Sequence, residues 1–196
     1  MSTKTIRLFK NDSLESLTHV HPVVPLLFWS PVIVFLLWRS LVVHELPIVQ
    51  IAAMAIPGLI VWTLMEYLLH RLVFHFPTTS AGGKRLVYLF HGVHHDAPDD
   101  KSRLVMPPAG SVIIMGILWV LFSALLPAPW AEPFCAFFIV GYLIYDYSHY
   151  ATHHFRMRHA WQQALKHHHM QHHFSNENAK FGVSSPFWDW VFGTLQ

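Results

Sequence analysis

The stretch LKHHHMQHHF at residues 165–174 and the shorter run FHGVHH at residues 90–95 share the pattern H-x-x-H-H. The pattern falls on His91, His94 and His95 in the earlier run, and on His169, His172 and His173 in the later one. On a helix, positions i, i+3 and i+4 lie on one face. Each run is therefore expected to point three imidazoles the same way, and three converging imidazoles are typical of a metal site.

Two further histidine pairs have spacings that suit metal binding. His149 and His153 are four positions apart, which stacks their rings on one helical face. His70 and His75 are five apart, about 140° on an ideal helix. Pro77 disfavours helix at the residue before it, so we expect His75 at the end of a helix. The four groups together hold ten histidines, enough for two metal ions without any other side chain.

The composition is that of a membrane protein. Of the 196 residues, 53% are hydrophobic and 12% are charged, which is about half the usual charged share. The net charge of +2 is too small to indicate nucleic-acid binding, and the basic residues do not form a stripe. The single cysteine, Cys135, lies in an apolar run, so no disulfide framework is expected.

Four apolar runs are long enough to cross a bilayer. They cover about residues 22–43, 46–69, 109–126 and 131–147. The polar remainder consists of the N-terminal 21 residues, which lack a cleavable signal pattern, a loop at 70–108 and a C-terminal cap at 148–196. We therefore expect one domain over residues 1–196, an all-α integral membrane protein in which four transmembrane helices carry a helical cap with a histidine-rich dimetal site.

The distribution of basic residues predicts the orientation. Of the 13 Lys and Arg residues, only Arg39 lies on the side of the short turns. The other twelve, Lys4 among them, lie in the N-terminal tail, the central loop and the C-terminal part. The positive-inside rule makes those regions cytoplasmic, and all four histidine groups then meet on the cytoplasmic face. We expect a multi-pass protein, in a bacterial inner membrane rather than the endoplasmic reticulum.

Ten imidazoles exceed the need of a structural zinc site, which four ligands close. Two first-row metals ringed by neutral nitrogen donors, with room for an oxygen ligand, suit oxygen activation or hydrolysis. A site at the mouth of an apolar helix bundle can receive an acyl chain from the bilayer, which favours oxidation of a lipid C–H bond. Glu66, four before His70, and Asp146, three before His149, could each accept the second ring N–H of a ligand histidine.

The histidine pattern resembles that of the membrane fatty acid hydroxylase superfamily, which includes sterol desaturases and carotenoid hydroxylases. The runs beyond the histidines look more specifically like the fatty acid 2-hydroxylases, from about Trp62 onward. They are Glu66-Tyr67 ahead of His70, HGVHHDAPDDKSRLVMPP at 91–108, GYLIYDYSHYATHH at 141–154, LKHHHMQHH at 165–173 and FGVSSPFWDWVFGT at 181–194.

The resemblance implies a di-iron, O2-dependent lipid hydroxylase that acts at C2 of a fatty acyl chain, free or in a ceramide-like sphingolipid. Zinc would suit the same imidazoles in a purified sample. The chain carries no cytochrome b5 domain ahead of its first span, so electrons are expected from a separate cytochrome b5-like or ferredoxin/reductase protein. Glu66, Tyr145 and Asp146 are implied as supporting residues. The implied metal ligands are His70, His75, His91, His94, His95, His149, His153, His169, His172 and His173.

Several assignments stay open at this point. His168 and His172 are also four apart, so His168 competes with His169 as a ligand, and the resemblance favours His169. Asp100 and Arg103 match family positions and would brace the central loop or touch a lipid headgroup. For Asp96 and Asp99, a place in a solvated loop carries at least as much weight as a supporting role at the site. The aromatic residues near the C-terminus would line an acyl tunnel or form a belt at the membrane interface: Phe174, Phe181, Trp188 and Trp190.

Two alternative functions remain. A relative in the same superfamily could use the same metals on a sterol, a carotenoid or another lipid. A membrane metal-binding or transport protein is the alternative from a different class. Against transport, Glu66 and Asp146 are the only acids near the inner ends of the spans, and no ionisable relay crosses the bilayer.

Overall fold

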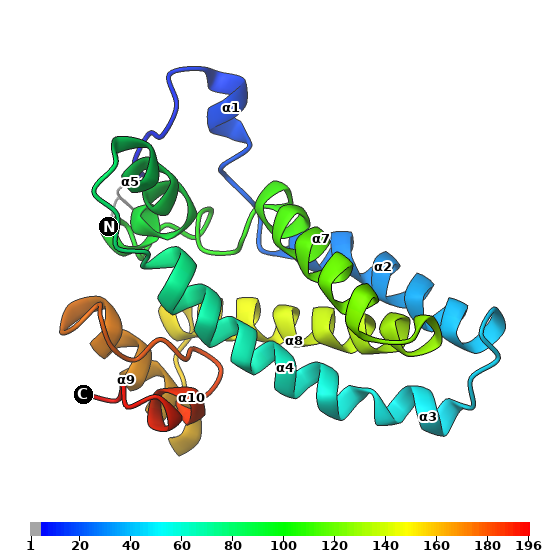
Figure 1. Cartoon of the computed structure of the whole chain (residues 1–196). Coiled ribbons are helices and arrows are strands. Elements are labelled where there is room, and N and C mark those ends of the chain that lie inside the picture. Colours follow the sequence, from blue (N-terminus) through cyan, green and yellow to red (C-terminus); the bar gives the residue numbers. More distant parts are fainter. Residues whose placement is uncertain (1–4) are drawn as a thin grey trace. The chain divides into compact units, whose positions relative to one another are not determined.

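The structure is a computed structural model that describes residues 5–196, so Lys4 lies outside the described residues. Over that range the regular secondary structure is all helical, without β-strands (Figure 1). The elements in chain order are α1 (Asp12–Ser16), α2 (Val23–Val42), α3 (Ile48–Ala53), α4 (Ala55–Leu69), η1 (His70–Phe74), α5 (Ala81–Val87), η2 (Tyr88–Gly92), α6 (Val93–Asp96), α7 (Pro108–Leu125), α8 (Ala128–His154), α9 (Ala160–Phe174) and α10 (Phe187–Val191).

The chain divides into two compact units, each built from separate segments. The histidine unit consists of the residues up to Pro22, Thr63–Pro107 and Tyr145–Gln196. The apolar unit consists of Val23–Trp62 and Pro108–Ile144. Helices α4 and α8 contribute residues to both. Neither unit is therefore a continuous piece of the chain.

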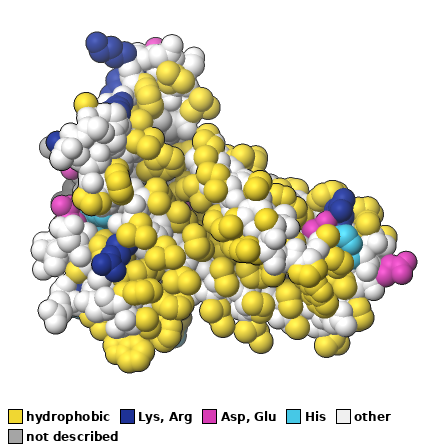
Figure 2. Space-filling view, in the orientation of Figure 1, with side chains coloured by type: hydrophobic (Ala, Val, Ile, Leu, Met, Phe, Trp, Pro, Cys, Tyr) yellow, Lys and Arg dark blue, Asp and Glu magenta, His cyan; other side chains and the backbone are white. Residues whose placement is uncertain are grey.

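Four helical segments are long and apolar enough to cross a membrane, as the sequence predicts. They are Val23–Val42, Ile48–Phe74, Pro108–Leu125 and Ala128–His154. Many of their large apolar side chains face outward; Ile117 and Leu125, for example, are 65% and 69% exposed. Figure 2 shows hydrophobic side chains over most of the visible face of the apolar unit. Contiguous apolar surface of this kind needs lipid against it, which makes this a multi-pass membrane protein.

Two of the predicted spans have different boundaries in the structure. The second begins only at Ile48, is interrupted at Met54 between α3 and α4, and continues beyond Leu69 into the π-helical turn η1. The fourth does not end near Tyr147, because α8 runs on to His154. The residues of this extension are polar, but histidines 149 and 153 belong to the buried histidine cluster described below, so the helix continues where hydropathy alone predicts its end.

The apolar unit has a core of aromatic residues between α4 and α8. Trp62 packs edge-on against Phe138 and Tyr142, with ring centroids 5.1 and 5.5 Å apart. Gly141 makes this approach available, because a Cβ atom there would lie 2.6 Å from the Cβ of Trp62. Small residues at such crossings let helices pack closely inside a membrane.

One partly buried ion pair joins α2 to α8 at an end of the apolar unit. The Arg39 guanidinium donates to both carboxylate oxygens of Glu132, at 3.0 and 3.1 Å from Nε, and His44 Nε2 lies 3.2 Å from the same group. The paired geometry is the strong form of an Arg–carboxylate contact. It offsets the cost of placing Glu132, only 8% exposed, next to a membrane span.

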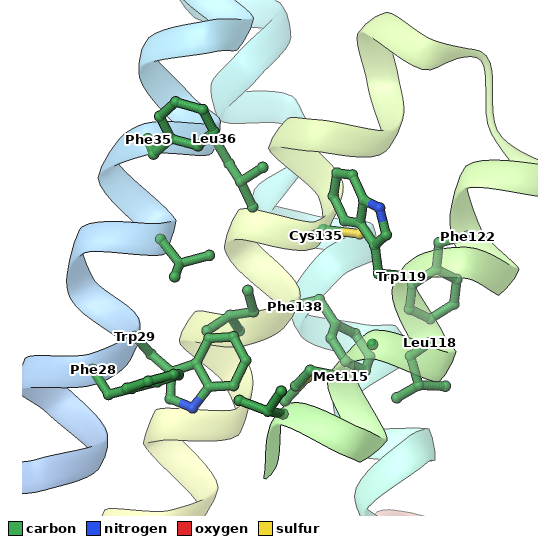
Figure 3. Close-up of a pocket in the computed structure, with 14 residues that line it drawn as sticks. Phe28, Trp29, Phe35, Leu36, Met115, Leu118, Trp119, Phe122, Cys135 and Phe138 are labelled. Atoms are coloured by element: carbon green, nitrogen blue, oxygen red, sulfur yellow. The ribbon is translucent and has the colours of Figure 1, made fainter. Parts of the chain in front are cut away.

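A cavity of about 390 Å³ lies inside the apolar unit, between α2, α7 and α8. Figure 3 shows its lining, which is almost wholly aliphatic and aromatic and includes Trp29, Trp119 and Phe138. The indole N–H of Trp29 donates to Ser111 at 3.2 Å. The cavity thus presents apolar surface that suits a hydrocarbon chain.

Candidate metal centre

His70 and His75 are brought together by a π-helical turn. The backbone N–H of His75 donates to the carbonyl of His70 at 3.1 Å, an i to i+5 bond, and η1 spans the residues between them. A π-turn is wider than an α-turn, and such turns are frequent at functional sites. The ring centroids lie 5.0 Å apart. His75 caps this turn, so its predicted place at a helix end is confirmed, whereas the π-turn itself was not expected.

A second π-turn, η2, contains the first histidine of the run of residues 91–95. It ends at Gly92, and α6 then continues through His94 and His95. The histidines of the run do not all meet the same partners. His91 and His95 face each other, with their Nε2 atoms 2.9 Å apart. His94 instead meets His149 with an Nε2–Nε2 distance of 2.9 Å.

All ten predicted ligand histidines lie in two groups of five. Within each group the nearest ring nitrogens are all within 4.8 Å of one another. The first group comes from η1, η2, α6 and α9, and the second from α6, α8 and α9. The members of the first group are His70, His75, His91, His95 and His172, and those of the second are His94, His149, His153, His169 and His173.

The expectation that each H-x-x-H-H run forms one three-imidazole site is therefore wrong. Each run divides between the two groups, with His94 in a different group from its neighbour His95, and His172 in a different group from His173. Successive residues on a helix point about 100° apart, so adjacent histidines diverge toward different centres. The two groups are close, since the stacked rings of His95 and His173 have centroids 4.1 Å apart.

Two backbone carbonyls fix the ring protons in the first group. His70 donates from Nδ1 to the carbonyl of Phe181 at 2.5 Å, and His172 donates from Nδ1 to the carbonyl of Ala179 at 2.7 Å. A neutral imidazole carries one proton. Nε2 of both rings is therefore a bare lone pair directed into the group.

The nitrogen spacings fit a bound metal ion. Nε2 of His70 lies 3.0 Å from Nε2 of His91, and Nε2 of His172 lies 3.1 Å from Nε2 of His75. Nitrogens bound at about 2.1 Å from one metal and at a right angle to each other are about 3 Å apart. Converging lone pairs repel each other unless a cation lies between them, so the donor set suits a divalent metal in each group.

Burial keeps the imidazoles outside the spans neutral. It lowers the pKa of His75 to about 4 and that of His95 to about 3, with neighbouring imidazoles adding to the effect. The pKa values of His91, His94 and His169 are lowered well below the ordinary value for the same reasons. At pH 7 these rings therefore offer lone pairs to a metal without competition from protons.

The three predicted supporting residues are buried, but Glu66 has partners that were not expected. Its carboxylate accepts the backbone N–H groups of Val183 and Ser184, each at 2.7 Å, while the Nδ1 proton of His70 goes to Phe181. Asp146 accepts the backbone N–H of Met106 at 3.2 Å. Tyr145 is 6% exposed, and its ring stacks on His149.

The choice between adjacent histidines 168 and 169 is clear in the geometry. His169 meets His153 with an Nε2–Nε2 distance of 2.8 Å, within the second group. His168 instead donates from Nε2 to Asp189 at 3.0 Å. Asp189, fully buried, was not singled out from the sequence, although it stands in the quoted run FWDWVFGT.

The central-loop residues have partners within the chain. Asp100 accepts hydrogen bonds from Thr5 at 3.0 Å and from Ser102 at 2.7 Å, and Arg103 pairs with Glu15. These contacts match the bracing alternative. Asp96 accepts the hydroxyl of Tyr88 at 3.0 Å, whereas Asp99 is exposed.

The aromatic residues divide between the site and the surface. Phe181 is buried and packs edge-on against His70, with ring centroids 5.7 Å apart. Trp188 donates from Nε1 to Thr63 at 3.0 Å. Phe174 and Trp190 are 71% and 68% exposed. A place at the membrane interface remains a prediction for these last two.

A cavity of about 500 Å³ with both polar and apolar lining reaches the first group. It is lined by His75, His91 and His95, and by polar side chains that include Lys84 and Asn178. The cavity gives the first group an approach for a polar molecule.

A family model described as fatty acid hydroxylase matches residues 55–194, a range that contains both histidine groups. The chain belongs to the fatty acid hydroxylase family. The hydroxylase is 38% identical over 191 residues to the dihydroceramide fatty acyl 2-hydroxylase of Arabidopsis thaliana, covering 96% of this chain and 79% of the relative. Over 140 residues it is 44% identical to the ceramide very long chain fatty acid hydroxylase of Saccharomyces cerevisiae, covering 70% and 36%.

Another relative and a solved structure extend the comparison. The hydroxylase is 34% identical over 215 residues to the fatty acid 2-hydroxylase of Homo sapiens, covering 98% of this chain and 57% of the relative. It also matches the solved structure of full-length scs7p, in which only the hydroxylase domain is visible, with a TM-score of 0.87 and 39% identity. That match covers 92% of this chain and 69% of the other.

Proposed function

We propose that this hydroxylase inserts one oxygen atom of O2 at C2 of a fatty acyl chain, with two iron ions held by the ten histidines. The observation that carries the proposal is the pair of five-histidine groups, in which ring nitrogens face one another at ligand spacing. Membership of the fatty acid hydroxylase family supports it.

The balanced reaction converts R–CH2–CO–X, O2, two electrons and two protons into R–CH(OH)–CO–X and water. Iron held by the ten histidines would supply the electron-transfer chemistry that O2 activation and C–H oxidation require. The histidines contribute neutral donors, and three of them, His70, His169 and His172, are 0% exposed. Two electrons per turnover must come from a reductant, for which we propose a separate electron-transfer protein of the cytochrome b5 or ferredoxin type.

The acyl carrier is proposed to be a ceramide-like sphingolipid or a free fatty acid. The names of the Arabidopsis and Saccharomyces relatives specify dihydroceramide and ceramide acyl groups, and that of the human relative specifies a fatty acid. C2 is one bond from the acyl carbonyl, so the polar end of the lipid must lie beside the histidines. The cavity at His75, His91 and His95 is a suitable place for it.

The test is lipid mass spectrometry on a host that expresses the protein with iron, oxygen and a reductase system, beside the His94→Ala variant. His94 is buried and its Nε2 faces both His149 and His173, so its loss should abolish turnover and lower the metal content while the protein still inserts. The proposal expects a gain of one oxygen at C2 of acyl chains, absent in the variant.

Other results would redirect the proposal. Oxygen found on a sterol or carotenoid would identify another substrate in the same family. Two bound metals without any oxidised lipid would favour metal binding or transport. An active His94→Ala variant with full metal content would contradict the ligand assignment.

A further inference from the structure

Two buried carboxylates hold four consecutive backbone N–H groups, those of residues Phe181 to Ser184. Asp189 accepts the first two at 2.8 Å each, and Glu66 accepts the last two at 2.7 Å each. The exposed fraction is 0% for Asp189 and 3% for Glu66. Carboxylates at that depth are costly unless hydrogen bonds satisfy them, so the segment is held in one backbone conformation.

The same segment presents its carbonyls to the first histidine group. The carbonyl of Ala179 accepts the Nδ1 proton of His172, and that of Phe181 accepts the Nδ1 proton of His70. One side of the segment is thus held by carboxylates, and carbonyls two residues apart set the two rings. The contacts run from Asp189 to the imidazole of His70 through one peptide group, which consists of the N–H of Gly182 and the carbonyl of Phe181.

The packing around Asp189 leaves no freedom for this arrangement. A Cβ atom on Gly182 would lie 2.9 Å from Oδ2 of Asp189 and 2.1 Å from the carbonyl oxygen of Ser185. Oδ2 also accepts the ring N–H of His168 at 3.0 Å. Through His168, one turn from His172, the carboxylate is joined to α9 as well.

We propose that the segment Ala179–Ser184, held by Glu66 and Asp189, is the positioning element that fixes the orientation and tautomer of His70 and His172. The inference rests on the proposed metal centre, and not on the identity of the lipid. Glu66 and Asp189 act through the backbone, since each accepts N–H groups of the segment.

Loosening the segment should misplace a ring proton. Without its carbonyl partner, a neutral imidazole can carry the proton on Nε2, the atom that must be bare to bind metal. Asp189→Asn keeps the size of the side chain but replaces one acceptor oxygen with an NH2 donor. Whichever way the amide is turned, its NH2 group faces one backbone N–H of the segment, that of Phe181 or that of Gly182, so this hydrogen bond is lost.

The first readout is metal affinity, measured on the full chain in detergent by titration of the metal-free protein with Zn²⁺ against a competing chelator. Wild type should bind two ions. Loss of a partner that orients a ligand typically weakens metal binding about 10–100-fold. Asp189→Asn should therefore lower the affinity for one of the two ions by that factor. The other ion should change by less than about threefold, because the second group has no member that bonds to the segment's carbonyls.

The second readout is the tautomer itself, from nitrogen NMR of metal-free protein labelled with ¹⁵N-histidine. The His70 signals are assigned by their loss in a His70→Gln sample. Wild type should show His70 protonated on Nδ1, and Asp189→Asn should show a new population protonated on Nε2.

Asp100→Asn is the matched control, since Asp100 is also a buried carboxylate, 5% exposed, with hydrogen-bond donors from Thr5 and Ser102. It should lower the melting temperature without selective loss of one ion or a tautomer change. Glu66→Gln should reproduce the selective loss and tests the inference even if Asp189→Asn does not fold. Unchanged affinity and tautomer in both variants, or equal weakening of both ions, would overturn it. Wild type that binds fewer than two ions would instead overturn the metal centre.

Discussion

At the scale of single residues, histidines that are adjacent in the sequence belong to different groups in the structure. His172 and His173 are neighbours on α9, yet they serve different groups. The H-x-x-H-H run therefore supplies imidazoles from one helix to both groups, an arrangement that would suit two metals side by side. Neighbouring side chains 100° apart on a helix give the physical reason.

Exchange of His168 and His169 for glutamine should separate the two neighbours. His169→Gln should cost the second group an ion, because Gln lacks the imidazole that faces His153 and His173. His168→Gln should keep two ions, since the Gln amide can still donate to Asp189. The measurement is metal content by mass spectrometry of the purified variants. Loss of metal from His168→Gln alone would reverse the assignment.

Glu15 makes a pH-dependent contribution to stability. Burial raises its pKa, but the N–H groups of Phe9 and Leu8 and the guanidinium of Arg103 outweigh burial and lower it to about 2. His19 also faces the carboxylate, at 3.5 Å. A depressed folded pKa gives stability that is fully present above the unfolded value, about 4.5, and lost as pH falls toward the folded value.

Glu15→Gln should therefore lower the melting temperature at pH 7, and the difference from wild type should shrink as the pH falls from about 5 to 3. Thermal unfolding in detergent across that range gives the measurement. Comparison at each pH removes the part of acid destabilisation that both proteins share. A difference that stays constant from pH 7 to 3 would show that Glu15 is not ionised against Arg103.

The hydrogen-bond partners of the ten histidines were harder to predict than the histidines themselves. The spacing of the ten histidines predicts their places on helical or near-helical segments, because the spacing of a side-chain type can be read directly from the sequence. The partners of their second nitrogens are the carbonyls of Ala179 and Phe181, and any residue type supplies a carbonyl. Glu66 was singled out by its position before His70, and its supporting role stays a prediction. Its backbone partners depend on the distant segment near Ser184, which its position in the sequence does not indicate.

At the scale of elements, hydropathy predicts where spans exist but not where they stop. Lipid-facing stretches of α2 and α7 end close to the predicted boundaries. By contrast, α8 continues beyond Tyr147 and the second span passes into η1, because there the helix surface faces other protein groups. Hydropathy measures transfer to lipid and carries no signal for that environment. Nor does it signal the π-turn that brings His70 and His75 together.

Two glycines on different helices of the apolar unit offer a matched test of helix packing. A Cβ at Gly141 would meet Trp62 at 2.6 Å, whereas a Cβ at Gly116 would have nothing within 4 Å. Gly141→Ala should therefore destabilise the protein by about 1–3 kcal/mol through overpacking. Gly116→Ala should be neutral, or stabilising by up to about 1 kcal/mol from helix propensity. Thermal unfolding in one detergent compares them, and equal effects would contradict the close approach at Gly141.

At the scale of the whole molecule, the basic residues are concentrated in the same unit as the clustered histidines. Among the described residues, Arg39 is the only Lys or Arg in the apolar unit, and it is neutralised by Glu132. All other described basic residues belong to the histidine unit, together with both five-histidine groups. The positive-inside rule then predicts that the chemistry lies on the cytoplasmic face, where soluble reductants are available.

Cysteine labelling tests that orientation in intact cells. The background is Cys135→Ala, which removes the one native thiol. Ala128→Cys, exposed at the start of α8, should react with a membrane-impermeant maleimide before lysis, and Ser13→Cys, exposed in α1, should react only after permeabilisation. Both positions are surface sites with small side chains, so the substitutions should leave the fold intact. The reverse pattern would put the histidine unit outside the cell and require a reductant there, because each turnover still consumes two electrons.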